Sequence, residues 1–234
     1  MALVLRENYQ QLAEYAVWKI EETPDFYRAG LILNDWEQNY LDNITHPRRK
    51  LTWLASRYLL KLLLNTNEFV ELLFDEYGKP FVANDDIFVS ISHCDTYAAA
   101  MVSRNCAVGI DIETTDRDIT PISRKFLSQI ELEQISGDKS LRQLMVYWGA
   151  KEVIYKIYGK RKLEFRDDMF IKPFQLAPRG DIYGVLMKNG RVEDYLLHYS
   201  FTEAFILVVG VEKEKRALDA WIKKGRPFEQ PFLI

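Results

Sequence analysis

The chain has 234 residues with a formal net charge of −3 at pH 7, and 48% of its residues are hydrophobic. This length and composition predict a folded globular protein and exclude a disordered chain. The acidic balance disfavours general nucleic-acid binding, which needs a basic surface, but leaves a local basic cluster possible. The sequence has neither an apolar run of the roughly 20 residues that cross a membrane nor a basic-then-apolar leader, so we expect a cytoplasmic protein without membrane contact.

The N-terminal part of the sequence predicts short segments followed by two helices. Residues 3–5 favour a strand, residues 12–20 favour either a helix or a strand, and Pro24 should break the pattern. Between residues 34 and 64 apolar side chains recur at helical spacing, and Pro47 suits the first position of a second helix.

The second of these helices carries a group of basic residues. They are Arg48, Arg49, Lys50, Arg57 and Lys61. Basic side chains on a helix are most often solvated surface. Arginine can also grip phosphate oxygens in a fork, so the group has a functional interpretation as well.

Strand-like alternation returns in the middle of the chain. The expected strands are residues 69–74, 87–92, 97–103 and 106–113. The last three are joined by short turns and should form an antiparallel meander, which would bring His93 close to Asp111 and Glu113. A lone histidine is more often structural, but this neighbourhood favours a functional one. Cys94 and Cys106 form no CxxC pair, and we expect buried free thiols.

The turn at residues 75–80 holds a lysine between two conformationally special residues. Gly78 is free to adopt a positive φ angle, and Pro80 should end local strand pairing. Lys79 would therefore lie at a rigid tip. An ordinary exposed lysine is the simpler interpretation of this position, and a functional lysine is the alternative.

Residues 108–113, Val-Gly-Ile-Asp-Ile-Glu, have the alternation of a strand with two different faces. Ile110 and Ile112 would point into the core, and Asp111 and Glu113 would lie side by side on the other face. Neighbouring carboxylates repel unless a positive charge lies between them, and a hard divalent cation would supply one. The alternative is an edge strand with one hydrated face. Gly109 would let a ligand or another backbone come close.

The C-terminal part predicts helices and then strands. Ser128 and Glu131 form a capping box, a structural role that suits Glu131 at least as well as a catalytic one. Residues 141–158 have the strongest helical spacing, and Glu152 and Lys156 would be neighbours on this helix, where an exposed ion pair is the simple interpretation. The other expected features are a helix end at Gly159, strands at residues 182–188, 192–201 and 205–211 with a turn at Asn189-Gly190, and a helix at residues 217–224.

Four motifs stand in a fixed order along the chain. They are Gly78-Lys79-Pro80, Ile91-Ser92-His93, Val108-Gly109-Ile110-Asp111-Ile112-Glu113, and Trp148-Gly149-Ala150-Lys151-Glu152 followed by Lys156. This set resembles the 4′-phosphopantetheinyl transferases of the surfactin-synthetase-activating type over residues 48–165. The resemblance implies an α+β fold with a pseudo-twofold pair of similar α/β subdomains, mostly antiparallel sheets and packed helices. The halves would be residues 1–110 and 111–234.

The resemblance also implies an activity and a site. Such an enzyme moves the phosphopantetheine group of coenzyme A onto a serine of an acyl or peptidyl carrier protein, acts as a monomer, and needs Mg²⁺, with Mn²⁺ as a substitute. The implied metal ligands are Asp111, Glu113 and Glu152. The implied catalytic residues are Glu152, Lys156 and Asp111, and the base would be either Glu152 or a metal-bound water near it. The implied coenzyme A contacts are Arg49, Arg57, Lys79, Pro80, Ser92, His93, Asp111, Glu152 and Lys156.

Some positions depart from the pattern, and other functions stay open. Gly149 replaces the usual serine or threonine after the tryptophan, and Val153 replaces a small residue. The resemblance does not decide whether Arg49 or Arg57 meets the 3′-phosphate. One alternative is a two-metal phosphodiesterase or nucleotidyl transferase with the same carboxylates. Another is a carrier-protein-binding module without turnover. For carrier docking we expect the loop at residues 114–125.

Overall fold

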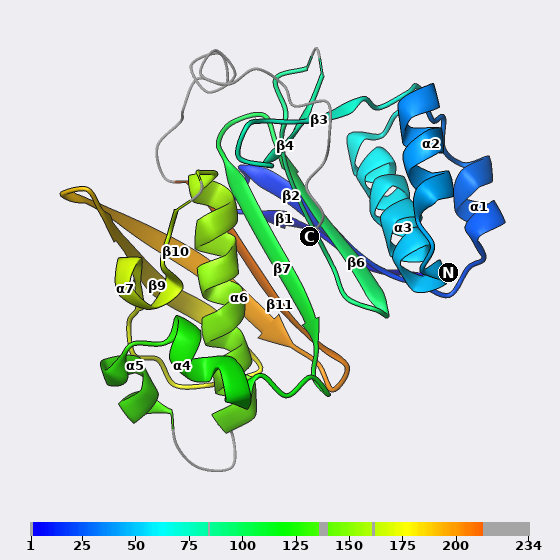
Figure 1. The fold of residues 1–234 in the computed structure, drawn as a ribbon. Helices are drawn as coiled ribbons and strands as arrows, with labels where there is room; N and C mark the ends of the chain where they lie inside the picture. The colour runs from blue at the N-terminus through cyan, green and yellow to red at the C-terminus, as the bar shows by residue number, and fades with distance from the viewer. Residues whose placement is uncertain (1, 84, 136–139, 161, 213–234) are drawn as a thin grey trace.

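The structure is a computed structural model that describes residues 2–83, 85–135, 140–160 and 162–212 (Figure 1). Within these residues the strands form two antiparallel sheets. In the first sheet the order is β1 (Leu3–Tyr9), β2 (Ala13–Lys19), β6 (Tyr97–Ser103), β5 (Phe88–His93), β4 (Pro80–Val82) and β3 (Leu72–Phe74). In the second it is β7 (Val108–Thr114), β11 (Phe205–Val211), β10 (Arg191–Phe201), β9 (Arg179–Lys188) and β8 (Met169–Ile171). The α+β fold class is therefore confirmed.

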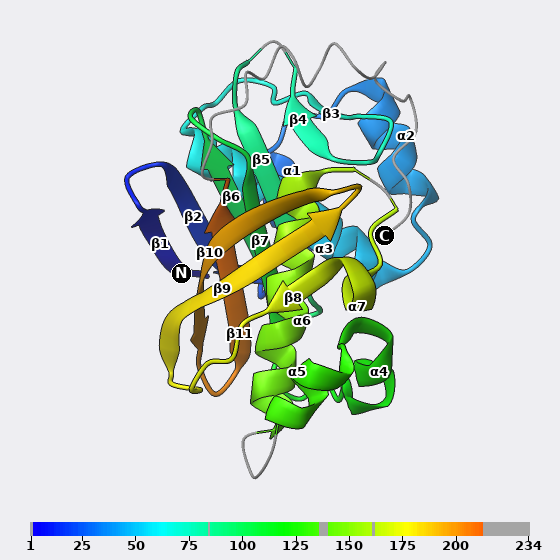
Figure 2. The same ribbon diagram turned by 90° about the vertical axis from the view of Figure 1, so that its left-hand side faces the viewer.

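A long helix packs on each sheet (Figures 1 and 2). On the first sheet α3 (Pro47–Leu64) contacts β6 and β2, with α1 (Pro24–Ala29) and α2 (Asp35–Asn43) beside it. On the second sheet α6 (Ser140–Tyr158) contacts β7 and β11. The short elements between β7 and α6 are η1 (Thr120–Ile122), α4 (Ser123–Phe126) and α5 (Gln129–Gln134), and α7 (Phe165–Asp168) follows α6.

The alanine-rich strand β6 lies between two parts of the core. Ala98 and Ala100 belong to the cluster under α3, whereas Ala99 and Met101 belong to the larger cluster that contains the second sheet and α6. Successive side chains of a strand point to opposite faces, so β6 serves both clusters. Small side chains on one face let α3 approach closely.

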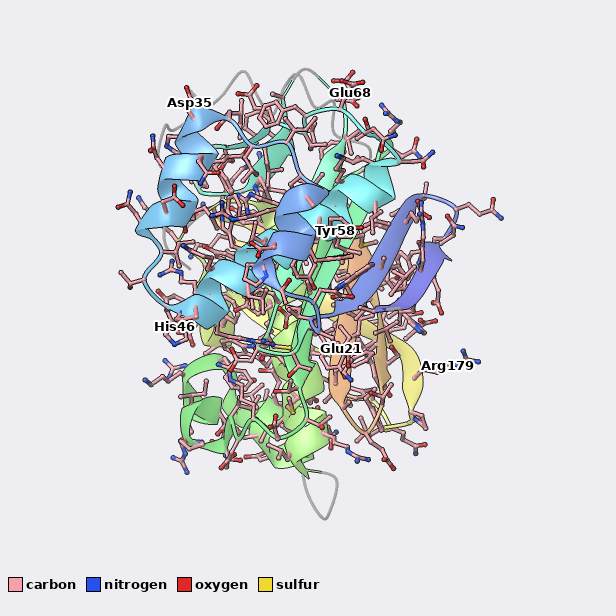
Figure 3. All side chains as sticks on the ribbon, turned by 90° about the vertical axis from the view of Figure 1, so that its right-hand side faces the viewer. Glu21, Asp35, His46, Tyr58, Glu68 and Arg179 are labelled. Carbon is pink, nitrogen blue, oxygen red and sulfur yellow. The ribbon has the colours of Figure 1, made fainter. Side chains whose placement is uncertain are left out.

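An aromatic group fixes α1 against α3, and Figure 3 labels one of its members, Tyr58. The ring of Tyr58 on α3 lies 5.3 Å from the ring of Trp18 and 5.4 Å from that of Phe26. Pro24 therefore does more than break a pattern, because it occupies the first turn of α1. Residues 12–20 contain β2 and no helix.

The expected meander of three strands is only partly right. β5 and β6 pair antiparallel, but β7 pairs with β11 and begins the second sheet. β5 and β7 lie side by side without pairing as strands, and two serine side chains of β5 accept hydrogen bonds from the backbone of β7. Ser90 Oγ accepts a hydrogen bond from Ile110 N at 3.1 Å, and Ser92 Oγ accepts one from Ile112 N at 3.4 Å. β7 is thus the edge strand of the second sheet, but this edge lies against β5 and β6 of the first sheet. Residues 108–112 of β7 are therefore buried, and the strand has no hydrated face there.

Several local expectations are confirmed. Gly78 and Gly159 have positive φ angles of 87° and 65°, and Asn189 and Gly190 have 52° and 72° in the β9–β10 turn. Ser128 and Glu131 form the capping box of α5. Pro80 differs from expectation, because it starts β4 and lies opposite Phe74.

Two other expectations are confirmed only in part, and two are not tested by the structure. β3 begins only at Leu72, three residues later than expected. Both cysteines are free thiols, and Cys106 is buried while Cys94 is half-buried. The expected helix at residues 217–224 lies outside the described residues. The expected boundary at residue 110 falls within β7, and the division into halves stays a prediction.

Candidate active site

The carboxylate of Asp111 lies at the junction of β7, β5 and α6. Its side chain is buried, with a residue exposure of 6%. Asp111 Oδ1 accepts hydrogen bonds from Ser92 Oγ and from Lys156 Nζ, each at 2.9 Å. Lys156 Nζ also donates to Ile110 O at 2.8 Å. Lys156 thus reaches from α6 to the neighbouring strand rather than lying in an exposed pair on its own helix.

The second oxygen of Asp111 has a different environment. Among the described residues, no group forms a hydrogen bond with the buried Oδ2 atom. A Cβ atom built on Gly149 would lie 3.4 Å from it. A buried carboxylate oxygen without a partner is costly, so this atom is suited to a ligand that supplies positive charge.

Glu113 lies two residues further along β7. Its Oε1 atom accepts hydrogen bonds from Trp148 Nε1 on α6, at 3.3 Å, and from Arg117 in the loop after β7. Burial, followed by the negative charge of Asp111, raises the pKa of Glu113. The two carboxylates are therefore electrostatic neighbours, as the alternation of the strand predicted.

Glu152 joins this group from α6. Burial raises its pKa to about 7, with Lys156 opposing the shift and Asp111 and Glu113 adding to it. Glu152 therefore exchanges a proton near neutral pH. This property is typical of a general base or acid.

A group of cations lies beside His93 at the end of β5. Partial burial lowers the pKa of this histidine, and the positive charges of Lys156, Arg49 and Arg57 lower it further. His93 itself keeps exposed surface, and Arg49 is half-buried. These residues form one positively charged neighbourhood, which suits an anionic ligand.

Arg57 differs from the surface arginine that helical spacing alone favours. Its side chain is only 11% exposed, and its guanidinium lies 3.5 Å from Glu37 Oε1 and 3.5 Å from the centre of the Trp53 ring. Burial lowers the pKa of Arg57 to about 10. Because Glu37 and Trp53 already hold Arg57, Arg49 is the freer of the two candidates for a phosphate.

Lys79 is buried rather than exposed at the tip of its turn. Its Nζ atom donates to Ile157 O in the last turn of α6 at 2.9 Å. Gly159 makes room for this side chain, because a Cβ there would lie 2.7 Å from Lys79 Cδ. Lys79, directly before β4, thereby joins the first sheet to the end of α6.

The family follows from comparison with known proteins. Residues 37–103 match the 4′-phosphopantetheinyl transferase N-terminal domain, and residues 107–205 match the 4′-phosphopantetheinyl transferase superfamily. The chain is 34% identical to the 4′-phosphopantetheinyl transferase gsp of Aneurinibacillus migulanus, over 46% of this chain and 46% of that protein. It is also 34% identical to the holo-[acyl-carrier-protein] synthase of Acholeplasma laidlawii (strain PG-8A), over 30% of this chain and 73% of that protein. The chain belongs to the 4′-phosphopantetheinyl transferase superfamily.

The match does not extend over whole relatives. The chain spans about half the length of the first of these two curated proteins. As for membranes, the helices within the described part of the chain are all too short or too polar to cross one.

The metal ligands that the phosphopantetheinyl transferase resemblance implies stay a prediction. Within the described residues, no three or more histidine, cysteine, aspartate or glutamate side chains stand together as a ready metal site. The donors nevertheless fit a hard cation. The buried Oδ2 atom of Asp111 lacks a hydrogen-bond partner in the described chain. The carboxylates of Asp111, Glu113 and Glu152 also interact electrostatically, so a cation among them would be attracted by all three.

The sequence did not predict two ion pairs that lie at or next to the site. Arg117 pairs with Glu113, and no periodicity marks a loop arginine as a partner of the site. Lys151 is fully buried and pairs with Glu131 at 2.8 Å. A lysine inside an apolar helix stripe could have signalled this pair, because buried lysine requires a partner.

Proposed function

We propose that the chain transfers the 4′-phosphopantetheine group of coenzyme A to a serine of an acyl or peptidyl carrier protein in a Mg²⁺-dependent reaction. The other product is adenosine 3′,5′-bisphosphate. The name of the Acholeplasma laidlawii relative, a holo-[acyl-carrier-protein] synthase, supports a carrier protein as the acceptor.

The observation that carries this proposal is the buried carboxylate of Asp111. One of its oxygens is held by Ser92 and Lys156, and the other is unpartnered within the described chain. Glu113 and Glu152 add negative charge to this position, and the cations around His93 lie beside it. Carboxylates for a metal next to cations for phosphates suit a reaction at a pyrophosphate.

The reaction needs a base for the serine hydroxyl, and Glu152 has that role in the proposal. It accepts the hydroxyl proton while the serine oxygen forms a bond to the β-phosphorus of coenzyme A. The bond from that phosphorus to the bridging oxygen breaks, and the bridging oxygen leaves on adenosine 3′,5′-bisphosphate. Burial raises the pKa of Glu152 to about 7 in the site without a metal, and a bound divalent cation would lower it, so Glu152 would be ionised and able to accept the proton.

Charge balance is the second requirement, because the substrate is an anion and the leaving phosphate gains charge. Lys156 lies next to Asp111 and would stabilise the leaving group. Asp111, Glu113 and Glu152 would hold Mg²⁺, which when bound supplies positive charge to the phosphate oxygens. Arg49, His93 and Lys79 would contact the phosphates of coenzyme A, and Arg57 would add positive charge to them from its pair with Glu37. Ser92 would orient Asp111, and Pro80 would fix the turn that holds Lys79.

A direct test uses Glu152→Gln. Loss of general-base help should lower turnover by about 10²–10⁴-fold. The acceptor would be an apo carrier protein incubated with coenzyme A and Mg²⁺, and intact-mass spectrometry would detect one added phosphopantetheine. Lys156→Ala should lower kcat rather than only raise KM for coenzyme A. A normal rate of transfer by the Glu152→Gln variant would contradict the proposed role of Glu152 as the general base.

Two other outcomes would favour the alternatives. Cleavage of a nucleic acid or nucleotide, supplied in place of coenzyme A, would favour a phosphodiesterase or nucleotidyl transferase. Binding of the carrier protein without an added mass would favour a module that lacks turnover.

For carrier docking we propose the loop at residues 114–125, which connects β7 to α4. Carrier proteins of this kind are acidic beside their serine, and a chain of net charge −3 needs a local basic surface to meet them. Arg117, Arg124 and Lys125 are exposed on this loop and on α4, and Ile130 on α5 adds an exposed apolar side chain. We also propose a cytoplasmic monomer with halves at residues 1–110 and 111–234. A loop exchange that leaves carrier affinity unchanged would contradict the docking proposal.

A further inference from the structure

Arg117 and Glu113 form an ion pair between the loop after β7 and the strand itself. The side chain of Arg117 is 48% exposed, whereas that of Glu113 is 15% exposed. The arginine therefore reaches from a solvated position onto a largely buried carboxylate. One oxygen, Glu113 Oε1, receives both Arg117 and the indole of Trp148.

Within the described part of the chain, Arg117 and Lys156 each form an ion pair with one of the site carboxylates. Lys156 neutralises Asp111, and Arg117 neutralises Glu113. The positive charge of Arg117 also acts on Glu152. Like-charged carboxylates at close range are unfavourable unless cations stand among them, so these two side chains stabilise the site without a metal.

The two cations are held differently. Lys156 is on a long helix, is 24% exposed, and has a second hydrogen bond to Ile110 O. Arg117 is half-exposed on a loop, and the ion pair with Glu113 is the interaction that draws its side chain to the site. An arginine on a loop can move away without disturbing β7, and a pair whose arginine is half-exposed costs less to break than a fully buried pair. A divalent cation that binds among these carboxylates would therefore displace Arg117 rather than Lys156.

We propose that Arg117 is an internal counter-ion that competes with a divalent cation for Glu113 and so lowers the metal affinity of the site. The inference rests on the proposed function only in placing a divalent cation among these carboxylates. A carboxylate oxygen bound to a guanidinium is less available to a metal, and a fixed positive charge nearby repels one. Arg117 is a positioning residue in this role, because it acts through Glu113.

The experiment measures Mn²⁺ binding to the full chain by electron paramagnetic resonance of the free ion, without coenzyme A or carrier protein. Arg117→Gln should bind Mn²⁺ more tightly than the unmodified chain by roughly two- to fivefold, the range expected for an exposed ion pair. Arg124→Gln is the matched control, because it removes the same charge from a nearby exposed position. It should leave Mn²⁺ affinity unchanged.

A double-mutant cycle isolates the pair. In a Glu113→Gln background, Arg117→Gln should strengthen Mn²⁺ binding by less than it does in the unmodified chain, because only the repulsion between the arginine charge and the metal remains to be removed. Equal or weaker binding by Arg117→Gln, an equal gain in Arg124→Gln, or no Mn²⁺ binding by either chain would overturn the inference. The transfer assay is a separate measurement. A chain with the Arg117 effect but without transfer would contradict only the proposed function, and an active chain without the effect would contradict only this inference.

Discussion

The ammonium group of Lys151 lies 2.8 Å from Glu131 Oε2, and neither side chain is exposed to solvent. The same ammonium group also lies within hydrogen-bond distance of three backbone carbonyls, those of Phe126, Phe165 and Met169, so its three N–H groups are shared among four acceptors. Glu131 Oε1 in turn accepts from Ile171 N at 2.9 Å. The pair therefore joins α4, α5, α7 and β8 to α6. Lys151 lies on α6 directly before Glu152.

Replacing Lys151 by alanine should destabilise the fold strongly. The variant leaves the Glu131 carboxylate buried without its cation and three carbonyls without a donor. Breaking a buried pair in this way typically costs about 3–5 kcal/mol in the free energy of unfolding. Urea unfolding followed by circular dichroism would measure the loss. Lys125→Ala, at an exposed position of α4, should stay within about 0.5 kcal/mol of the unmodified chain. Equal stabilities for the two variants would show that the pair has no such role.

Gly149 should not tolerate even a methyl group. A Cβ at this position would lie 2.7 Å from Val208 Cγ2 on β11, a branched side chain with little freedom to move. We expect Gly149→Ala to lower the free energy of unfolding by about 1–3 kcal/mol. Val208→Ala removes the obstructing methyl group, so the double variant should lose less than the sum of the two single losses. Strict additivity would mean that this contact does not limit the packing of α6 on β11.

Lys79→Met separates a structural role from a binding role. Loss of the hydrogen bond to Ile157 O should cost about 1 kcal/mol of stability. If Lys79 also contacts coenzyme A, as we propose, KM for coenzyme A should rise as well. Lys61→Met is the matched control, because Lys61 Nζ makes a similar 2.9 Å bond to Gly30 O. It should lose similar stability with an unchanged KM. An unchanged KM in both variants would show that Lys79 has a structural role and no role in binding coenzyme A.

The affinity for coenzyme A should depend on pH through His93. Partial burial and then the charge of Lys156 hold the pKa of this histidine below its ordinary value, so the ring is mostly neutral at pH 7. A phosphate placed among Lys156, Arg49 and His93 would raise that pKa, and the bound state would take up a proton. Affinity should therefore increase as pH falls through the pKa of the bound state, and level off below that of the free state.

Calorimetric titration of coenzyme A between about pH 8 and pH 6, around the ordinary histidine pKa, would measure this effect. The phosphate of coenzyme A also titrates in this range, so the relevant quantity is the difference between the unmodified chain and His93→Gln. Parallel affinity profiles for the two proteins would contradict a contact between His93 and a phosphate.

The sequence by itself determined the elements whose signals are local. The apolar period of α6, the alternation of β7, the capping box at Ser128, and the Asn189-Gly190 turn depend on residues within a few positions of each other. Local spacing also places Asp111 beside Glu113 on one face, and with the resemblance of the motifs it indicated the carboxylates from which the site is built. The pattern could do this because side-chain direction within a strand or helix follows from its period.

The tertiary structure alone decided the partners of these residues. β7 pairs with β11 rather than with β6, although β6 is its neighbour in sequence. Lys156 lies against Asp111, Arg57 against Glu37, and Lys151 against Glu131. These pairs join positions 20 to 45 residues apart, and no period of the sequence encodes such distances. They form because burial leaves each charge without water, so the nearest opposite charge that folding provides becomes its partner.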